Sequence, residues 1–310
     1  MANYFQRVPG LIVFKGVTKR FKRTAALHDA SFRVEKGSMA GLIGPNGSGK
    51  TTSLKLMLGL LRRDSGEIEI LGHDPWMEGE VVRAFTGFLP ESPIYPRNIR
   101  VSQLLGHVAR LKYASRFDVS RIARLVGIER YMEHQVSALS RGYLQRLGLA
   151  IALLGDPEIL LLDEPTANLD PKARIEILRL VSILKRDLGA TIIISSHILP
   201  ELQQVIDSAI LIARGKVVDY GSIDYLASKY GARIVYAVYT RNPRTLMKRL
   251  VDVDYVRGVV ERGEYVEVHI DPLAGEEFLR LVDSLGGDLA SRVEVRSGYL
   301  GEIYERAIAT

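Results

Sequence analysis

Hydrophobic and polar side chains alternate in three short stretches of the first quarter of the chain, residues 11–17, 30–35 and 67–71. Alternation with a period of two is typical of strands that bury one face and expose the other. A turn sequence, Asp-Ser-Gly at 64–66, precedes the third stretch. The pattern therefore predicts half-exposed antiparallel strands in this part of the chain.

Three other apolar segments, residues 39–43, 159–162 and 192–194, are continuous rather than alternating. Continuous apolar runs are typical of strands buried on both faces inside a parallel sheet. Apolar positions three and four residues apart predict helices over about 101–154 and 172–188. This mixture indicates an α/β fold with a parallel core sheet and a helical insert.

The pattern after residue 220 has a shorter cycle of strands and helices. It predicts, in order, a strand at 232–239, a helix at 242–250, two strands within 255–270, a helix at 276–285, a strand at 292–296 and a final helix. A β–α–β–β–α–β order indicates a small α+β domain and suggests a ferredoxin-like arrangement. We therefore expect two domains, 1–220 and 221–310, with a helical subdomain at about 92–155 inside the first.

Composition narrows the class of protein. Hydrophobic residues make up 47% and charged residues 25% of the 310 residues, as in a packed globular protein. No apolar run approaches the roughly 18 residues of a membrane-spanning helix, and the apolar stretch near the N-terminus is too short for a secretory signal. The lack of cysteine excludes disulfides, thiol catalysis and cysteine-ligated metals. We therefore expect a cytoplasmic protein.

The net charge of +6 is concentrated at the N-terminal end. Residues 1–63 contain twelve lysines and arginines against two acidic residues, Asp29 and Glu35, whereas the rest of the chain carries a net charge of −4. A basic lobe attracts polyanions such as nucleotides, but nucleic acid or an acidic lipid surface would use the same field. The charge alone therefore does not distinguish among nucleotides, nucleic acid and an acidic lipid surface as the partner.

The strongest candidate for a functional site lies between the buried run 39–43 and a helix-forming run at 52–61. The pattern G-x-x-x-x-G-K-[ST] occurs there in the strand, loop, helix order that a phosphate-binding loop requires. It consists of Gly44, Pro45, Asn46, Gly47, Ser48, Gly49, Lys50 and Thr51, followed by Thr52. Glycines let successive backbone N–H groups approach one anion, and the following helix adds its positive end. Lys50 is then placed to reach the β and γ phosphates, and Thr51 to ligate Mg²⁺.

Two carboxylates, Asp163 and Glu164, end the second buried run. Ligands of open α/β sheets bind beyond the carboxyl ends of the strands, and successive strand residues point to opposite faces, so the two acids need different roles. We assign Asp163 to the Mg²⁺ shell and Glu164 to orienting or deprotonating water. The alternative is two acids that only begin the next turn. His197, at the end of the third run, is a candidate γ-phosphate contact or a structural histidine.

Two further residues are candidates because of their surroundings. Phe21 lies in a basic cluster, residues 19–23, where an aromatic ring can stack on a base; a core phenylalanine flanked by solvated charges is the alternative. Glu91 lies between Pro90 and Pro93, which exclude regular structure and place its carboxylate on a bend.

Taken in order, these motifs resemble those of an ATP-binding-cassette (ABC) ATPase over residues 11 to about 220. GPNGSGKT resembles Walker A, ILLLDEP resembles Walker B, NLD at 168–170 resembles the D-loop, and His197 falls at the switch histidine. Phe21 sits where this family has an adenine-stacking aromatic. The resemblance implies a P-loop NTPase fold with an antiparallel β subdomain and a helical subdomain, and ATP and Mg²⁺ as cofactors.

The resemblance also implies how the site is completed. Two cassettes would close head to tail, so that Ser140 and Gly142 of the signature LSRGY contact the γ-phosphate held by the other cassette. Asp170 of the D-loop and Glu91 of the Q-loop would join the nucleotide site. The roles implied are Mg²⁺ ligation by Thr51, Asp163 and Glu91, and catalysis by Lys50, Glu164 and His197.

Two motifs depart from the usual family pattern. Glu91 stands where the Q-loop usually has glutamine, and Arg141 and Tyr143 replace glycine and glutamine of the usual LSGGQ. Arg141 would either add a cation beside the phosphates or point to solvent. Glu91, together with SHILPE at 196–201, resembles the ATPase subunits of ABC-2 type exporters, which often carry an extra C-terminal domain.

The resemblance therefore implies ATP-driven formation of a homodimer or heterodimer that powers a separate transmembrane permease at the inner face of the cell membrane, with no nucleic-acid partner. A soluble ABC-type ATPase acting on nucleic acid or the translation machinery is the alternative. A regulatory nucleotide-binding module without turnover is a third reading, which Asp163, Glu164 and His197 oppose.

Overall fold

The computed structural model describes residues 11–112, 116–203, 205–271, 274–287, 289–297 and 299–309. Its contacts divide the chain into two compact units, Met1–Tyr220 and Gly221–Thr310. No helix in these described ranges is long and apolar enough to cross a membrane.

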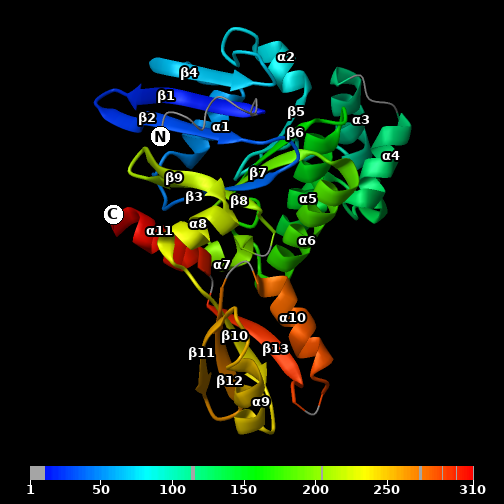
Figure 1. Ribbon diagram of the computed structural model, residues 1–310. Coiled ribbons are helices and arrows are strands. Elements are labelled where there is room, and N and C mark those ends of the chain that lie inside the picture. The colour runs from blue at the N-terminus through cyan, green and yellow to red at the C-terminus, as the bar shows by residue number, and fades with distance from the viewer. Residues whose placement is uncertain are drawn as a thin grey trace. The chain divides into compact units, whose positions relative to one another are not determined.

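A six-stranded sheet in the order β5-β6-β7-β3-β8-β9 forms the core of the first unit (Figure 1). Its strands are β3 (Met39–Ile43), β5 (Thr86–Leu89), β6 (Ile159–Asp163), β7 (Thr191–Ser196), β8 (Ser208–Ala213) and β9 (Lys216–Ser222). The pairs that join β5, β6, β7, β3 and β8 are parallel. β3, β6 and β7 are buried along their whole length, as their continuous apolar runs predict.

The register of this sheet brings the carboxyl ends of its central strands together. Asp163 of β6 pairs with Ser195 of β7, and Ile43 of β3 pairs with Ser196 of β7. β5 pairs in parallel with β6, so the bend that follows β5 lies at the same edge. The segments that leave β5, β6, β7 and β3 therefore meet along one edge of the sheet.

A three-stranded antiparallel sheet in the order β2-β1-β4 completes the strands of this unit. Its strands are β1 (Ile12–Phe21), β2 (Thr24–Val34) and β4 (Ser65–Ile70). Phe14 and Phe32 stack inside it with ring centroids 4.4 Å apart. β1 and β2 are longer than the alternation predicted, because the charged residues 19–23 at the hairpin end hide the periodicity.

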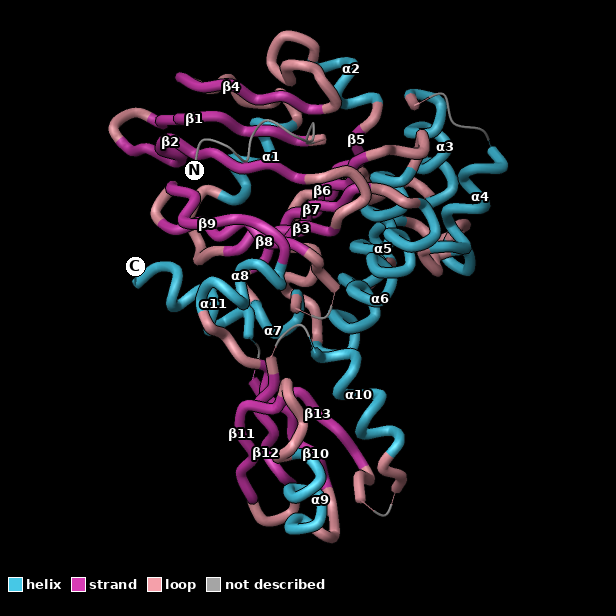
Figure 2. Tube along the Cα trace, in the orientation of Figure 1, coloured by secondary structure: helices cyan, strands magenta, loops and turns pink. Residues whose placement is uncertain are grey.

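The helices of the first unit lie around the core sheet, with α3 and α4 on the side away from the three-stranded sheet in Figure 2. They are α1 (Lys50–Met57), α2 (Gly79–Ala84), α3 (Val101–Leu111), α4 (Arg116–Leu125), α5 (Arg141–Leu153), α6 (Pro171–Leu188) and α7 (Leu199–Leu202), with short 3-10 turns η1 (Glu129–Tyr131) and η2 (Val136–Ala138). The caps of α6 are readable in the sequence: Asp170 accepts a hydrogen bond from the N–H of Ala173 at 3.0 Å, and Gly189 ends the helix at φ +62°.

The second unit is an antiparallel sheet in the order β11-β12-β10-β13. Its elements are α8 (Ile223–Tyr230), β10 (Ile234–Tyr239), α9 (Pro243–Leu250), β11 (Val256–Glu261), β12 (Tyr265–Ile270), α10 (Gly275–Ser284), β13 (Arg292–Ser297) and α11 (Tyr299–Ala309). From β10 to β13 the order is β–α–β–β–α–β, the order of ferredoxin-like domains. Helix α8 was not predicted, although Ser222 and Gly231 cap its two ends.

One face of this second sheet carries the core of the unit. Alternate residues of β10 and β12 are buried against α9 and α10. The core residues on these four elements are Ile234, Tyr236, Val238, Val266, Val268, Ile270, Leu246, Leu250, Phe278 and Val282. Val235, Tyr239 and Tyr265 point to the opposite face, which α9 and α10 leave open.

Replacing Phe278 with alanine tests this core. The ring is fully buried and packs on Tyr236 with centroids 4.9 Å apart. We expect Phe278→Ala to lower the free energy of unfolding of this unit by about 3–5 kcal/mol, measured by hydrogen exchange of the β10 and β12 amides in urea. Leu279→Ala is the matched control, because Leu279 is 41% exposed on the same helix and its change should fall within about 0.5 kcal/mol. Equal effects of the two variants would contradict this core.

Candidate functional site

The loop between β3 and α1 is shaped by glycines that no other residue could replace without moving the backbone. Gly49 has φ +111°, and a Cβ there would lie 2.6 Å from the carbonyl oxygen of Ala26. A Cβ on Gly44 would lie 2.1 Å from the carbonyl oxygen of Ile212. Gly49 is also the N-cap of α1, and no side chain caps that helix. The first-turn N–H groups of α1 are therefore available to an anion.

Lys50 lies at the centre of this loop and is held on both sides. Its Nζ donates to the carbonyl oxygens of Gly44 at 2.8 Å and Pro45 at 3.2 Å. It also forms an ion pair with Glu164, with Nζ 3.2 Å from Oε1, and both side chains are only 7% exposed. The structure thus brings together the predicted lysine of the phosphate loop and the predicted catalytic acid.

One serine contacts both of the acidic residues at the end of β6. The hydroxyl of Ser195 donates to Oδ1 of Asp163 at 2.7 Å and accepts from the backbone N–H of Glu164 at 2.8 Å. Glu164 itself has φ +47°, a conformation that costs a non-glycine residue of order 1 kcal/mol or more. Sequence reasoning missed Ser195, although its place one strand away from Asp163 is fixed by the parallel register.

Glu164 also contacts the third predicted catalytic residue. Nδ1 of His197, which follows β7, lies 2.9 Å from Oε2 of Glu164. Oε1 of the same carboxylate is buried, and within the described residues it has no hydrogen-bond donor, because the ion pair to Lys50 lacks hydrogen-bond geometry. The site therefore offers a buried acceptor beside a lysine and a histidine.

The oxygen groups at this edge fit a magnesium ion better than a metal with an all-protein ligand cage. Asp163 is a buried carboxylate, 2% exposed, and the hydroxyl of Thr51 belongs to the first turn of α1. The part of the chain that the structure describes contains no cluster of three or more acidic, histidine or cysteine ligands. Mg²⁺ usually takes one or two protein carboxylates and completes its shell with phosphate oxygens and water.

Phe21 and Glu91 are the two remaining candidates, and both are exposed. Phe21 ends β1, pairs with Thr24 and is 46% exposed, with Nζ of Lys19 5.4 Å from its ring centroid. Its ring is therefore open to a planar partner and is not a core residue. Glu91 is exposed on the bend after β5, beside β6.

The signature residues occupy a different place from the phosphate loop. Ser140 and Gly142 begin α5 and line a cavity of about 220 Å³ together with Asp170. Arg141 lines the same cavity and is exposed. None of the residues lining this cavity belongs to the phosphate loop, and Glu164 and His197 lie outside it as well. Within one chain, the predicted signature contacts therefore do not form part of the Lys50 site.

The unusual Tyr143 of the signature has a partner that the sequence did not reveal. Its ring packs on Tyr131 of η1 with centroids 4.1 Å apart at 44°. A hydrogen bond donated by the Tyr131 hydroxyl to Tyr143 favours the neutral phenol and raises the pKa of Tyr131. The pair joins the first turn of α5 to η1 within the helical subdomain. No local pattern indicates this contact, because Tyr131 lies in a short turn without periodicity.

Comparisons with known proteins agree with this geometry. Residues 27–167 match the family model described as ABC transporter. The chain is 30% identical to the bacitracin transport ATP-binding protein BcrA of Bacillus licheniformis over 87% of this chain and 84% of that protein. It is 34% identical to the Nod factor export ATP-binding protein I of Burkholderia lata over 77% of this chain and 80% of that protein.

Two solved structures show the same fold. One is an ATP-binding subunit of an ABC transporter, 28% identical with a TM-score of 0.65, covering 71% of this chain and 93% of that one. The other is a dimeric bacterial ABC transporter cassette, MJ0796, 25% identical with a TM-score of 0.62, covering 68% of this chain and 98% of that one. With its phosphate loop, paired acids and histidine at one sheet edge, this chain belongs to the ABC transporter family, among its ATP-binding proteins.

Proposed function

We propose that this chain is the ATP-hydrolysing subunit that powers a separate membrane permease of an ABC-2 type exporter. The observation that carries the proposal is the arrangement around Glu164, whose carboxylate lies 3.2 Å from Nζ of Lys50 and 2.9 Å from Nδ1 of His197. The names of the bacitracin and Nod factor relatives support the export role. The physical location that follows is the inner face of the cell membrane, beside the permease.

The phosphate loop would bind the triphosphate, and Lys50 would turn from Glu164 to the β and γ phosphates. The first-turn N–H groups of α1 provide further donors, because no side chain caps that helix. Phe21 would stack on the adenine, a contact of about 1–3 kcal/mol. Asp163, Thr51 and, through its bend, Glu91 would hold Mg²⁺, which supplies charge neutralisation between the phosphates when bound.

Hydrolysis would use Glu164 to accept the proton of an attacking water. Its Oε1 is a buried acceptor without a hydrogen-bond donor in the described chain, so a water placed there would satisfy it. The displacement of Lys50 by the phosphates would leave that oxygen open to the water. His197, 43% exposed at the end of β7, would contact the γ-phosphate from the other side of the carboxylate.

The signature would act on a second copy or a second cassette. Ser140 and Gly142 line a cavity separate from the Lys50 site, which supports contact with the nucleotide in trans, as does the dimeric state of the related MJ0796 cassette. Arg141 is exposed at that cavity and would add a cation beside the phosphates. Asp170 already caps α6, so its role would be to hold the D-loop in place.

The bend after β5 is the surface that would contact the permease. Ile94 is 95% exposed there, next to the exposed Glu91. Ile94 would supply the apolar part of that contact. Movement of Glu91 on nucleotide binding would then be passed to the permease through this bend.

Neutralising the proposed base tests the chemistry. We expect Glu164→Gln to lower ATP turnover by about 10²–10⁴-fold, the usual contribution of a general base, while ATP binding persists. Single-turnover ATPase assays and equilibrium ATP binding measure the two effects, and size-exclusion chromatography with ATP and Mg²⁺ measures dimer formation. Undiminished ATP turnover would contradict the assignment of Glu164 as the general base. Failure of ATP to induce self-association of this variant would contradict the proposal that ATP-driven dimerisation powers a permease.

Replacing Lys50, the proposed cationic partner of the phosphates, tests the role of the phosphate-binding loop. We expect Lys50→Ala to weaken ATP binding by at least about tenfold, because a charge-assisted hydrogen bond contributes about 1.5–3 kcal/mol. Lys55→Ala is the matched control, since Lys55 lies exposed on the same helix and should leave affinity unchanged. Fluorescent ATP-analogue titration provides the measurement, and equal affinities of the two variants would refute the assignment.

Separating the two tyrosines tests whether they position the signature. In the Glu164→Gln background, we expect Tyr131→Ala to weaken ATP-induced self-association by about 3–10-fold, because a ring pair contributes about 0.5–1.5 kcal/mol. ATP affinity of the monomer should not change. Tyr131→Phe, which keeps the ring, should restore most of the association measured by analytical ultracentrifugation. A parallel loss of monomer ATP affinity would indicate a general folding defect instead.

A further inference from the structure

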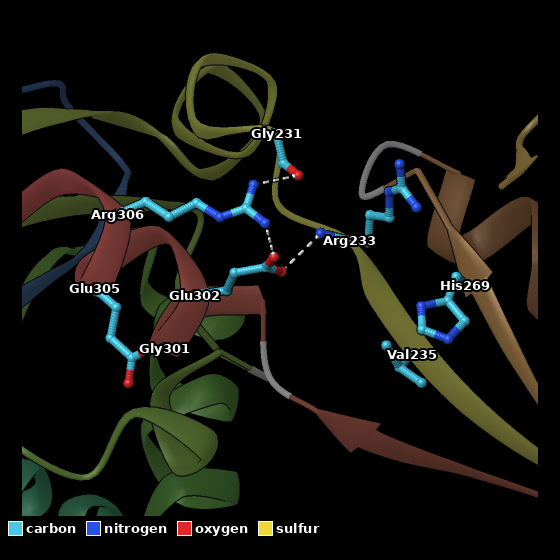
Figure 3. A pocket seen from close by; sticks show the side chains of 8 residues that line it. All are labelled: Gly231, Arg233, Val235, His269, Gly301, Glu302, Glu305 and Arg306. Atoms are coloured by element: carbon cyan, nitrogen blue, oxygen red, sulfur yellow. Dashed lines mark hydrogen bonds and ion pairs between the residues drawn. The ribbon is translucent and has the colours of Figure 1, made fainter. Parts of the chain in front are cut away.

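At several places in this chain a guanidinium group joins a glutamate to a backbone carbonyl group. In the second unit, Arg306 of α11 pairs with Glu302 and donates to the carbonyl oxygen of Gly231 at 2.8 Å, which fixes α11 to the end of α8 (Figure 3). In the first unit, Arg174 of α6 makes the same two kinds of contact, and its glutamate is Glu201. The contacts of Arg174 bear on the proposed ATPase because of the two segments that they connect.

The carbonyl group that Arg174 holds belongs to the D-loop, residues 168–170. Nε of Arg174 donates to the carbonyl oxygen of Leu169 at 2.9 Å. The preceding residue, Asn168, has φ +60°, a conformation that a non-glycine residue keeps only where its surroundings hold it. The conformation of the D-loop therefore depends on contacts such as the one that Arg174 provides.

The same arginine also reaches the segment that follows His197. Nη1 of Arg174 lies 3.1 Å from Oε1 of Glu201 on α7, a helix that begins two residues after His197. The two side chains are only 30% and 21% exposed. Oε2 of Glu201 is buried, and within the described residues it has no hydrogen-bond donor. Arg174 is thus the one cation that those residues offer to this carboxylate.

The two segments joined in this way belong to different parts of the proposed reaction. Residues 168–170 line the cavity of the signature residues Ser140 and Gly142, which we propose meets the nucleotide of a second copy. His197 belongs to the site within one chain, where its Nδ1 lies 2.9 Å from Oε2 of Glu164. A link between the two segments would therefore connect the γ-phosphate site of one copy to the surface that it presents to the other.

We propose that Arg174 is a positioning residue that sets the D-loop according to the position of His197. The inference rests on the proposed function and names the residue through which the γ-phosphate site acts on the second copy. When a phosphate draws His197 away, α7 carries Glu201 with it. The guanidinium follows, because a buried carboxylate left without its cation is unfavourable. The carbonyl group of Leu169 then moves with the guanidinium, and the D-loop changes position at the signature cavity.

Hydrogen exchange of the full chain without nucleotide tests the hold on the D-loop, independently of the proposed ATPase. We expect Arg174→Gln to raise exchange of the Ala167 and Leu169 amides by about tenfold or more, because the loop loses a charge-assisted hydrogen bond. The amides of β7, residues 191–196, should not change. Arg186→Gln is the matched control, since Arg186 is exposed on the same helix. Unchanged exchange in Arg174→Gln, or an equal rise in the control, would overturn the proposal.

Self-association tests the effect on the second copy. In the Glu164→Gln background, we expect Arg174→Gln to weaken ATP-induced self-association by about tenfold or more, while the ATP affinity of the monomer stays the same. Arg174→Lys keeps the charge without the planar fork and should recover only part of the association. Analytical ultracentrifugation measures both variants beside Arg186→Gln, which should associate like the parent. Full association of Arg174→Gln would refute the role of Arg174, whereas a parent that does not associate with ATP would contradict the proposed function instead.

A double-mutant cycle tests the connection to His197. If His197 acts on the D-loop through Arg174, the two residues belong to one linkage, and their effects on association should not add. We expect His197→Ala and Arg174→Gln together to weaken ATP-induced self-association no more than the stronger single change does. Additive losses would mean two independent contacts and would overturn the coupling.

Discussion

Parallel pairing of β3, β6 and β7 is the constraint on which the site depends. These strands are in register, with Asp163 opposite Ser195 and Ile43 opposite Ser196. The segments that follow β3, β6 and β7 therefore lie at the same edge of the sheet. The loop, the acids and the histidine come from segments up to about 150 residues apart in the chain. The backbone ladder of this buried sheet brings groups that are distant in sequence to hydrogen-bond distances.

The buried Lys50–Glu164 pair shows how the edge is prepared for reaction. Two charges that are 7% exposed lose most of their hydration, and such a pair is weak evidence for stability because desolvation offsets the attraction. Glu164 is also held at positive φ, a strained conformation that the hydrogen bond from its N–H to Ser195 supports. Both features are better explained by chemistry than by folding, since triphosphate would compete directly for the lysine.

Most of this site could be predicted from the sequence because its residues lie in local motifs at the ends of recognisable strands. The apolar runs before Gly44 and Asp163 are buried strands, and the loop conformation follows from glycines in strained positions. Ser195 and Tyr131 could not be found, since each acts through a neighbour on another element whose register or packing the local pattern does not contain. Helix α8 was missed because it begins directly after β9, at the boundary that we expected between the two domains.

Gly215, in the turn between β8 and β9, forms backbone hydrogen bonds to two parts of the proposed nucleotide site. Its N–H donates to the carbonyl oxygen of Ser48 at 3.1 Å, and its own carbonyl accepts from the N–H of His28 at 2.7 Å. A single glycine therefore links the phosphate loop to β2, the strand that forms the hairpin with Phe21. The proposed binding of the phosphates and the proposed stacking of the base on Phe21 would thus be mechanically joined, so a shift of the hairpin would alter both together.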